Sequence, residues 1–157
     1  MHRKRHSARR RSAGFTLIEL LIVIAIIALL ASIAIPNLRS AMNKAKQSKT
    51  LADIKAIGNA MESYAVDNNT YPKGLTDANA QILSGNVSRY LQTVPPTDGW
   101  SHSWHIDTNA QGTIYTITSF GADGTSGTNP GGPTGDFNSD IIFSNNTFYQ
   151  WPQGAQQ

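Results

Sequence analysis

The sequence predicts an α+β protein in which one long N-terminal helix packs on a small antiparallel β-sheet. Three observations indicate this class. An unbroken apolar run covers residues 15–35, and an amphipathic segment with helical spacing follows it over residues 37–65. Four short segments rich in β-branched and aromatic residues lie between residues 103 and 151. Packing the sheet on the apolar stripe of the helix would give a lollipop-shaped molecule.

The apolar run is long enough to cross a bilayer. Its residues 15–35 would form about 31 Å of helix, the thickness of a hydrocarbon core. The preceding segment, residues 1–14, holds six Lys and Arg residues, and positive charge flanking a first membrane helix tends to stay in the cytoplasm. We therefore expect residues 15–36 to form a single-pass membrane anchor, with the rest of the chain facing outward.

The small residues that could be cleaved stand in an unusual place. An ordinary secretory signal has a shorter apolar region and is cut after it. Here Ala13 and Gly14 come before the apolar run. A cut after Gly14 would remove the basic leader, residues 1–14, and would keep the whole apolar helix with a free amine on Phe15.

Residues 37–67 are predicted to form an amphipathic second half of the same helix. Pro36 is expected to kink it, because proline lacks a backbone donor and crowds the preceding turn. The sequence from Asp67 to Pro72 is expected to end it, since the residue before a proline is pushed out of helical space. The apolar positions recur mostly three, four or seven residues apart: Leu38, Ala41, Met42, Ala45, Ala52, Ile57, Ala60, Met61 and Tyr64.

Residues 68–157 are predicted to form a small globular domain. It begins with a connector that contains two short helical candidates, residues 77–83 and 87–91, separated by Ser84-Gly85-Asn86. An antiparallel sheet of three or four strands then follows, with strands expected over residues 103–107, 113–119, 141–143 and 147–151.

Composition limits the class of function. The leader holds six of the 13 basic residues, so the cleaved chain would keep seven against ten acidic residues, a net charge of −3. The basic pI is therefore due to the leader, and it does not indicate a nucleic-acid-binding surface on the cleaved chain. The sequence has no cysteine, no phosphate-binding glycine loop with lysine and no HExxH pair. We expect a structural protein and not an enzyme.

Glu19 is the one carboxylate in the apolar run. Such a group inside hydrocarbon costs roughly 2.5 to 3.5 kcal/mol, so it usually has a partner or a function. If helices assemble side by side, the Phe15 ammonium of a neighbouring subunit can pair with Glu19 and set the stagger between subunits. The alternative is that Glu19 lies at the headgroup level and favours the helix N-terminus through the helix dipole.

These residues resemble the start of proteins in the type IV pilin and type II secretion pseudopilin superfamily. Gly14 is followed by Phe15-Thr16-Leu17-Ile18-Glu19 and by an apolar run to Pro36. The resemblance implies a pilin-like fold, cleavage after Gly14 by a prepilin peptidase and methylation of Phe15. It also implies assembly through the Glu19 region into a homo-oligomeric filament, driven by a separate inner-membrane platform.

A long connection rich in Gly, Pro, Asn and Asp covers residues 119–141. Loops of this length are usually functional or disordered. Calcium takes six to eight oxygen ligands, which a glycine-rich loop can wrap to supply. The side chains available for such a site are Asp123, Asp136, Asn138 and Asp140. The alternative is a solvated cluster of turns, because these residue types commonly form turns.

The same connection resembles the calcium loop of major type II secretion pseudopilins. The match consists of the turn from Ser119 to Gly124, the pair Gly131-Gly132 and the pair Asp140-Ile141. Upstream, Asp98-Gly99-Trp100 is similar to the family's Asp-Pro-Trp-Gly turn, with glycine in place of proline. Two departures stand out. Residues 125–130 look inserted, and Asn138 stands where the family often has a second aspartate, which should weaken a calcium site.

The resemblance as a whole favours the major pseudopilin of a type II secretion system. Such a subunit would assemble into a pseudopilus in the cell envelope and drive protein export, with calcium as its cofactor. One alternative is a type IV pilin for adhesion, motility or DNA uptake. The absence of cysteine argues against it, since many type IV pilins close a C-terminal loop with a disulfide. The other alternative is a monomeric membrane-anchored binding module.

Overall fold

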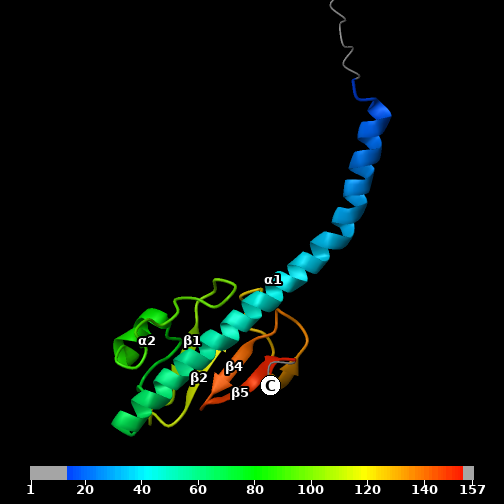
Figure 1. Cartoon of the computed structure of the whole chain (residues 1–157). Helices are drawn as coiled ribbons and strands as arrows, with labels where there is room; N and C mark the ends of the chain where they lie inside the picture. The colour runs from blue at the N-terminus through cyan, green and yellow to red at the C-terminus, as the bar shows by residue number, and fades with distance from the viewer. Residues whose placement is uncertain (1–13, 154–157) are drawn as a thin grey trace, which may run out of the picture. The chain divides into compact units, whose positions relative to one another are not determined.

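The computed structural model describes residues 14–153. The predicted leader lies outside these residues except for Gly14. The chain divides into two compact units, one ending at Arg39 and the other beginning at Ser40. Along the described part the elements are α1 (Leu17–Asn68), α2 (Ala80–Val87), β1 (His105–Thr108), β2 (Tyr115–Ser119), β3 (Gly132–Thr134), β4 (Ile141–Ser144) and β5 (Thr147–Pro152) (Figure 1).

Helix α1 is continuous over 52 residues and passes through Pro36. The prediction that the apolar and amphipathic segments form one helix is therefore confirmed. The helix ends at Asn68, within one residue of the expected end. Asn69 follows with a φ of 57°, the left-handed conformation that often terminates a helix, and the Asn68 side-chain amide donates to the Tyr64 carbonyl.

The domain buries only the C-terminal part of the amphipathic segment. The first buried residue of α1 is Thr50, and Ile54, Ile57, Gly58, Ala60 and Met61 follow it. Earlier positions of the predicted apolar face are exposed, Leu38 by 62% and Met42 by 52%. The apolar stripe thus has two parts: the later one forms the core, and the earlier one has no cover within the chain's described residues.

Helix α2 replaces the two short helices predicted in the connector. It runs through Ser84, Gly85 and Asn86, so the predicted break there was wrong. The Asn79 side chain caps the helix by accepting from the backbone N–H groups of Gln81 and Ile82. Leu83 and Val87, four residues apart, are both buried. Their burial outweighs the helix penalty of one glycine, about 1 kcal/mol.

The sheet has five strands in the order β1-β2-β4-β5-β3. Strands β1, β2, β4 and β5 pair antiparallel, as predicted. Strand β3 pairs parallel to β5, so the sheet is mixed, which corrects the expectation of a purely antiparallel sheet. Strand β3 reads Gly132-Pro133-Thr134 and lies at the edge, where proline is tolerated. Its composition carries no strand pattern.

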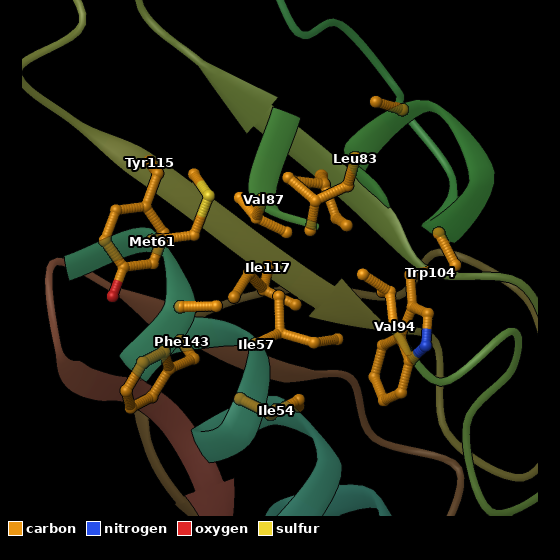
Figure 2. Close-up of a cluster of buried hydrophobic side chains, with 14 of the residues drawn as sticks. Ile54, Ile57, Met61, Leu83, Val87, Val94, Trp104, Tyr115, Ile117 and Phe143 are labelled. Carbon is orange, nitrogen blue, oxygen red and sulfur yellow. The ribbon is translucent and has the colours of Figure 1, made fainter. Parts of the chain in front are cut away.

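The core lies where α1 and α2 pack on the sheet (Figure 2). Ile57 and Met61 of α1 lie beside Ile117 of β2 and Phe143 of β4, while Leu83 and Val87 enter from α2. Trp104, just before β1, is buried and donates from its indole N–H to the Pro95 carbonyl at 2.8 Å.

Candidate functional site

The N-terminal site is built around a reciprocal helix cap. The backbone N–H and the hydroxyl of Thr16 each donate to Glu19 Oε2 at 2.8 Å. In return, the Glu19 backbone N–H donates to Thr16 Oγ1 at 3.3 Å. This is a capping box, which satisfies donors that the first turn of a helix leaves unpaired. The local role of Glu19 at the helix N-terminus therefore has a geometric basis, and its pairing with a neighbour's Phe15 stays a prediction.

The apolar part of α1 exposes its side chains on every side. The helix contains a window of mean hydropathy 3.0, none of it buried, which is long and apolar enough to cross a membrane. Phe15 is 85% exposed at the start of the described chain, and Gly14 is exposed beside it. A helix that is apolar all round belongs in lipid or among other helices. This segment is therefore a candidate membrane span.

The second candidate site is the loop between β2 and β4, which contains two carboxylates of interest. Asp140, directly before β4, is fully buried. Burial raises the pKa of the Asp140 carboxyl above its ordinary value, and the negative charge of nearby Asp123 acts in the same direction. The two carboxylates therefore repel each other when both are ionised, and their role as ligands stays a prediction.

The other two predicted ligands, Asp136 and Asn138, lie in an exposed turn of the same loop. Asp136 Oδ1 accepts from the Asn138 backbone N–H at 3.1 Å, and both residues are exposed. Within residues 14–153, no three His, Cys, Asp or Glu side chains are grouped as metal ligands. Metal binding by the four predicted side chains stays a prediction.

Backbone oxygens do gather at this loop. Gly121 has a φ of 68°, and a Cβ on it would lie 2.8 Å from the carbonyl oxygens of Phe137, Asn138 and Ser139. Only glycine fits there. Carboxylate and carbonyl oxygens are the donors that calcium prefers, so the chemistry of the loop fits that ion.

Sequence reasoning missed Gln150, which fastens the loop from β5. Its side chain is buried. Nε2 donates to the Asp140 carbonyl at 2.9 Å, and Oε1 accepts from the Gly131 N–H at 3.2 Å. The only sequence signal for Gln150 is that it is a polar residue among aromatic residues in a strand segment, and this does not show which groups it contacts. Strand pairing alone brings Gln150 to the loop.

The turn at Asp98-Gly99-Trp100 attaches the start of this loop to α1. The buried Asp98 carboxylate accepts from the backbone N–H groups of Trp100 and His102 and from the hydroxyl of Ser119, the last at 2.6 Å. The Gly99 N–H donates to Thr50 Oγ1 at 2.9 Å. A Cβ on Gly99 would lie 2.0 Å from the Lys46 carbonyl oxygen. Glycine therefore stands where proline would lose the hydrogen bond and clash.

Comparison with known proteins gives matches over both parts of the chain. A family model described as type II secretion system (T2SS), protein G, matches residues 37–136. The model of the prokaryotic N-terminal methylation motif matches residues 9–35. Together these matches cover the apolar helix, the amphipathic segment and the domain as far as Asp136, near the end of the loop between β2 and β4.

Several relatives are named type II secretion system core protein G. The one from Aeromonas hydrophila is 36% identical over 129 residues, which cover 76% of this chain and 90% of the relative. The one from Vibrio cholerae is 35% identical over 127 residues, 75% of this chain and 86% of the relative. The one from Escherichia coli K12 is 34% identical over 130 residues, 77% and 89% of the two chains. These matches favour the pseudopilin interpretation over a surface pilin or a monomeric module. The chain belongs to the type II secretion system protein G family.

Proposed function

We propose that this chain is a structural subunit of a type II secretion pseudopilus and assembles through its N-terminal helix to drive protein export. The observation that carries the proposal is the apolar part of α1, exposed on every side and headed by Gly14, Phe15 and Glu19. Such a helix is stable in lipid as a monomer and in a helical bundle as a filament. Both environments are needed by a subunit that leaves the membrane to assemble.

Processing prepares the helix for both states. A prepilin peptidase would cut after Gly14 and methylate the new terminal amine of Phe15, as the match to the methylation motif over residues 9–35 suggests. The cut removes six basic residues from the cytoplasmic side. It also places a positive amine four residues before Glu19, where each helix offers one cation and one carboxylate to its neighbours.

Assembly would then use Glu19 twice. In a single chain its carboxylate accepts from Thr16. In the filament, the Phe15 ammonium of the next subunit would join these donors, and the matched pair would set the axial stagger. A register without the pair would leave a carboxylate uncompensated among apolar side chains, which is costly.

We place the subunit in the inner membrane before assembly, with the domain that follows Ser40 facing the periplasm. The six basic residues of the leader and the apolar helix support this orientation. The assembly platform and the prepilin peptidase are the partners that this location implies.

We also propose calcium as the ligand of the loop, held by Asp123, Asp140 and backbone carbonyls. A cation there would compensate the buried Asp140 carboxylate, and because it would bind only the folded state it would stabilise that state increasingly as its concentration rises above Kd. Calorimetric scans of the full-length chain in detergent, with calcium or with a chelator, test this: calcium should raise the melting temperature of the wild type and not that of Asp140→Asn. Equal melting temperatures for the wild type in both buffers would contradict it.

Mass spectrometry of the N-terminus tests the filament proposal. The chain is recovered from membranes of cells with an active prepilin peptidase and of cells without one. The expected product in the first is a chain that starts at N-methyl-Phe15, and in the second a chain that keeps residues 1–14. An intact Met1 terminus in both kinds of cell would exclude the filament role. It would favour the alternative of a monomeric membrane-anchored binding module.

A further inference from the structure

We propose that the basic segment of α1 just after the membrane helix, residues 37–49, binds the headgroups of anionic phospholipids in the outer leaflet of the membrane. Its basic side chains are Arg39, Lys44, Lys46 and Lys49. The inference rests on the membrane location proposed above, and it adds a lipid partner at the outer end of the anchor.

Charge is divided sharply along the chain. Residues 20–52 hold these four basic side chains and no acidic one, so their net charge is +4. Residues 53–157 hold three basic and nine acidic side chains, a net charge of −6. An anionic bilayer surface attracts the first segment and repels the second. The distribution therefore fits a helix end that binds the bilayer surface and a domain that does not.

The side of the membrane on which these charges lie is unusual. Lys and Arg residues near a first membrane helix normally concentrate on the cytoplasmic side. In the unprocessed chain, the six basic residues of the leader outnumber the four of residues 37–49. A cut after Gly14 would remove the six and keep the four, which reverses the balance across the helix. Positive charges kept on the outer side are stabilised only if a negative partner lies there.

The segment begins within reach of a headgroup layer. Arg39 comes four residues after Ile35 and Lys44 comes nine, about 6 Å and 14 Å along the continuous helix. The headgroup layer is roughly 5 to 8 Å thick on each side of the hydrocarbon core. Long basic side chains lean toward the N-terminus of a helix and extend to that layer. Leu38, exposed by 62%, suits the apolar boundary of the same layer.

The basic side chains surround the helix and do not form one stripe. At about 100° per residue, Lys44 and Lys46 leave the helix on opposite sides. Lys49 pairs with Asp53 at 2.8 Å, so part of its charge is already compensated. A single protein surface covers one side of a helix, whereas headgroups surround it. The arrangement therefore favours a lipid layer over one docked protein.

Lys44 also lines a cavity that suits a phosphate group. The cavity holds about 180 Å³ and lies between α1 and the segments that follow β3 and β5. Gln47 and Gln153 bring side-chain amides to it, and Thr134 brings a hydroxyl. Hydrogen bonds from a charged donor to phosphate are stronger than those from neutral donors, and amide and hydroxyl groups add to them. Lys44 is therefore the position where we place a headgroup phosphate.

Electron spin resonance with spin-labelled lipids tests the proposal on the full-length chain in phosphatidylcholine vesicles. The measured quantity is the preference of the protein for spin-labelled phosphatidylglycerol over spin-labelled phosphatidylcholine. The test variant combines Arg39→Gln, Lys44→Gln and Lys46→Gln. The matched control combines Lys55→Gln, Lys73→Gln and Arg89→Gln, which removes the same charge from exposed positions of the domain.

The test variant should lose roughly half or more of the preference of the wild type, because each basic side chain near an anionic surface supports up to about a fivefold preference. The control variant should match the wild type. So should a third variant that keeps the charges, with Arg39→Lys, Lys44→Arg and Lys46→Arg. Salt at about 1 M should remove the difference between the proteins.

Equal preferences in the test and control variants would overturn the proposal. If the test variant then also failed to form filaments in electron microscopy, the basic segment would bind the acidic domain of a second copy and not lipid. The leader contributes equally to all the proteins, so the comparison holds whether or not it is cut. Failure of processing is measured by the N-terminal mass, and absence of motionally restricted lipid around every protein would contradict the membrane location itself.

Discussion

Gly58 of α1 lies directly against the ring of Phe143 of β4: a Cβ on Gly58 would lie 2.4 Å from Phe143 Cε1. A helical glycine usually costs stability, because its chain loses more freedom on folding than any other. Here the missing side chain lets the helix approach the sheet closely enough to bury Ile54, Ile57 and Met61. The contact explains why a glycine interrupts the amphipathic face of a long helix.

Gly58→Ala should therefore destabilise the domain despite the higher helix propensity of alanine. Overpacking of this kind costs about 1 to 3 kcal/mol, against a gain of about 1 kcal/mol from propensity. Gly85→Ala in α2 is the control, since a Cβ there meets nothing within 4 Å and should stabilise. Chemical denaturation of both variants measures the difference, and a Gly58→Ala protein as stable as Gly85→Ala would show that Phe143 moves aside freely.

Thr50→Val should cost about 1 to 3 kcal/mol of unfolding free energy, because it keeps the shape of Thr50 but leaves the Gly99 N–H without an acceptor. Thr50→Ser keeps the hydroxyl and should lose less. Urea denaturation followed by tryptophan fluorescence is the measurement, since Trp100 lies in the attached turn. If the two substitutions cost the same, packing of the Thr50 methyl and not its hydrogen bond holds the turn to α1.

The buried Tyr115 predicts a loss of stability at alkaline pH. Its hydroxyl donates to Glu62 Oε1 at 3.1 Å and accepts from the Asn146 N–H at 2.9 Å. Burial raises the pKa of Tyr115 above its ordinary value of 10.0, and the Glu62 charge adds to the rise. Above pH 10 the unfolded chain therefore loses a proton that the folded chain keeps. Stability should be constant below about pH 10 and should fall above it by about 1.4 kcal/mol per pH unit.

Tyr115→Phe should flatten that alkaline slope, although the variant is less stable at pH 7. Tyr71 also donates to Glu62, and burial raises its pKa too, so Tyr71→Phe serves as the comparison at a less buried site. Denaturation midpoints from pH 7 to pH 11 give both slopes. A slope for Tyr115→Phe equal to that of the wild type would assign the alkaline loss to other groups.

Two substitutions of Glu19 separate its two roles. Glu19→Gln can still accept from Thr16 and so keeps the helix cap, but it cannot pair with an ammonium by charge. Glu19→Ala loses both. We expect both variants to insert into membranes and both to fail in filament assembly. Chemical crosslinking through lysine side chains and electron microscopy measure the assembly. Normal filaments from Glu19→Gln would mean that the cap alone, and not the pairing with Phe15, is what assembly requires.

Much of this protein was predictable because its main signals are local. The apolar run, its basic flank and the Gly14-Phe15 junction stand next to one another in the chain, and the helix through Pro36 follows from spacing. Four strands were placed correctly because each segment is rich in β-branched or aromatic residues and is bounded by turn residues. Helix α2 was misplaced since Gly85 suggests a break, while the burial of Leu83 and Val87 that overrides it comes from distant residues.

The loop shows the limit most clearly. Its acidic residues were visible in sequence, but Asp136, Asn138 and Asp140 cannot be told apart there by residue type and spacing. Burial separates Asp140 from the exposed pair, and that burial depends on the start of β4. The contacts of Gln150 form only when β5 lies beside the loop. The hydrogen bonds that Gly127 and Asn129 donate to Asp140 likewise form only when residues 125–130 fold against the start of β4.

The sequence by itself determined the membrane helix, the processing motif, the amphipathic half and the α+β class, because each depends on periodicity or on adjacent residues. Tertiary structure alone decided the parallel edge strand β3, the extent of α2, the close contact of Gly58 with Phe143 and the partners of Asp140. These features join residues that are far apart along the chain, and their free energies come from burial and hydrogen bonds that exist only once the sheet has formed.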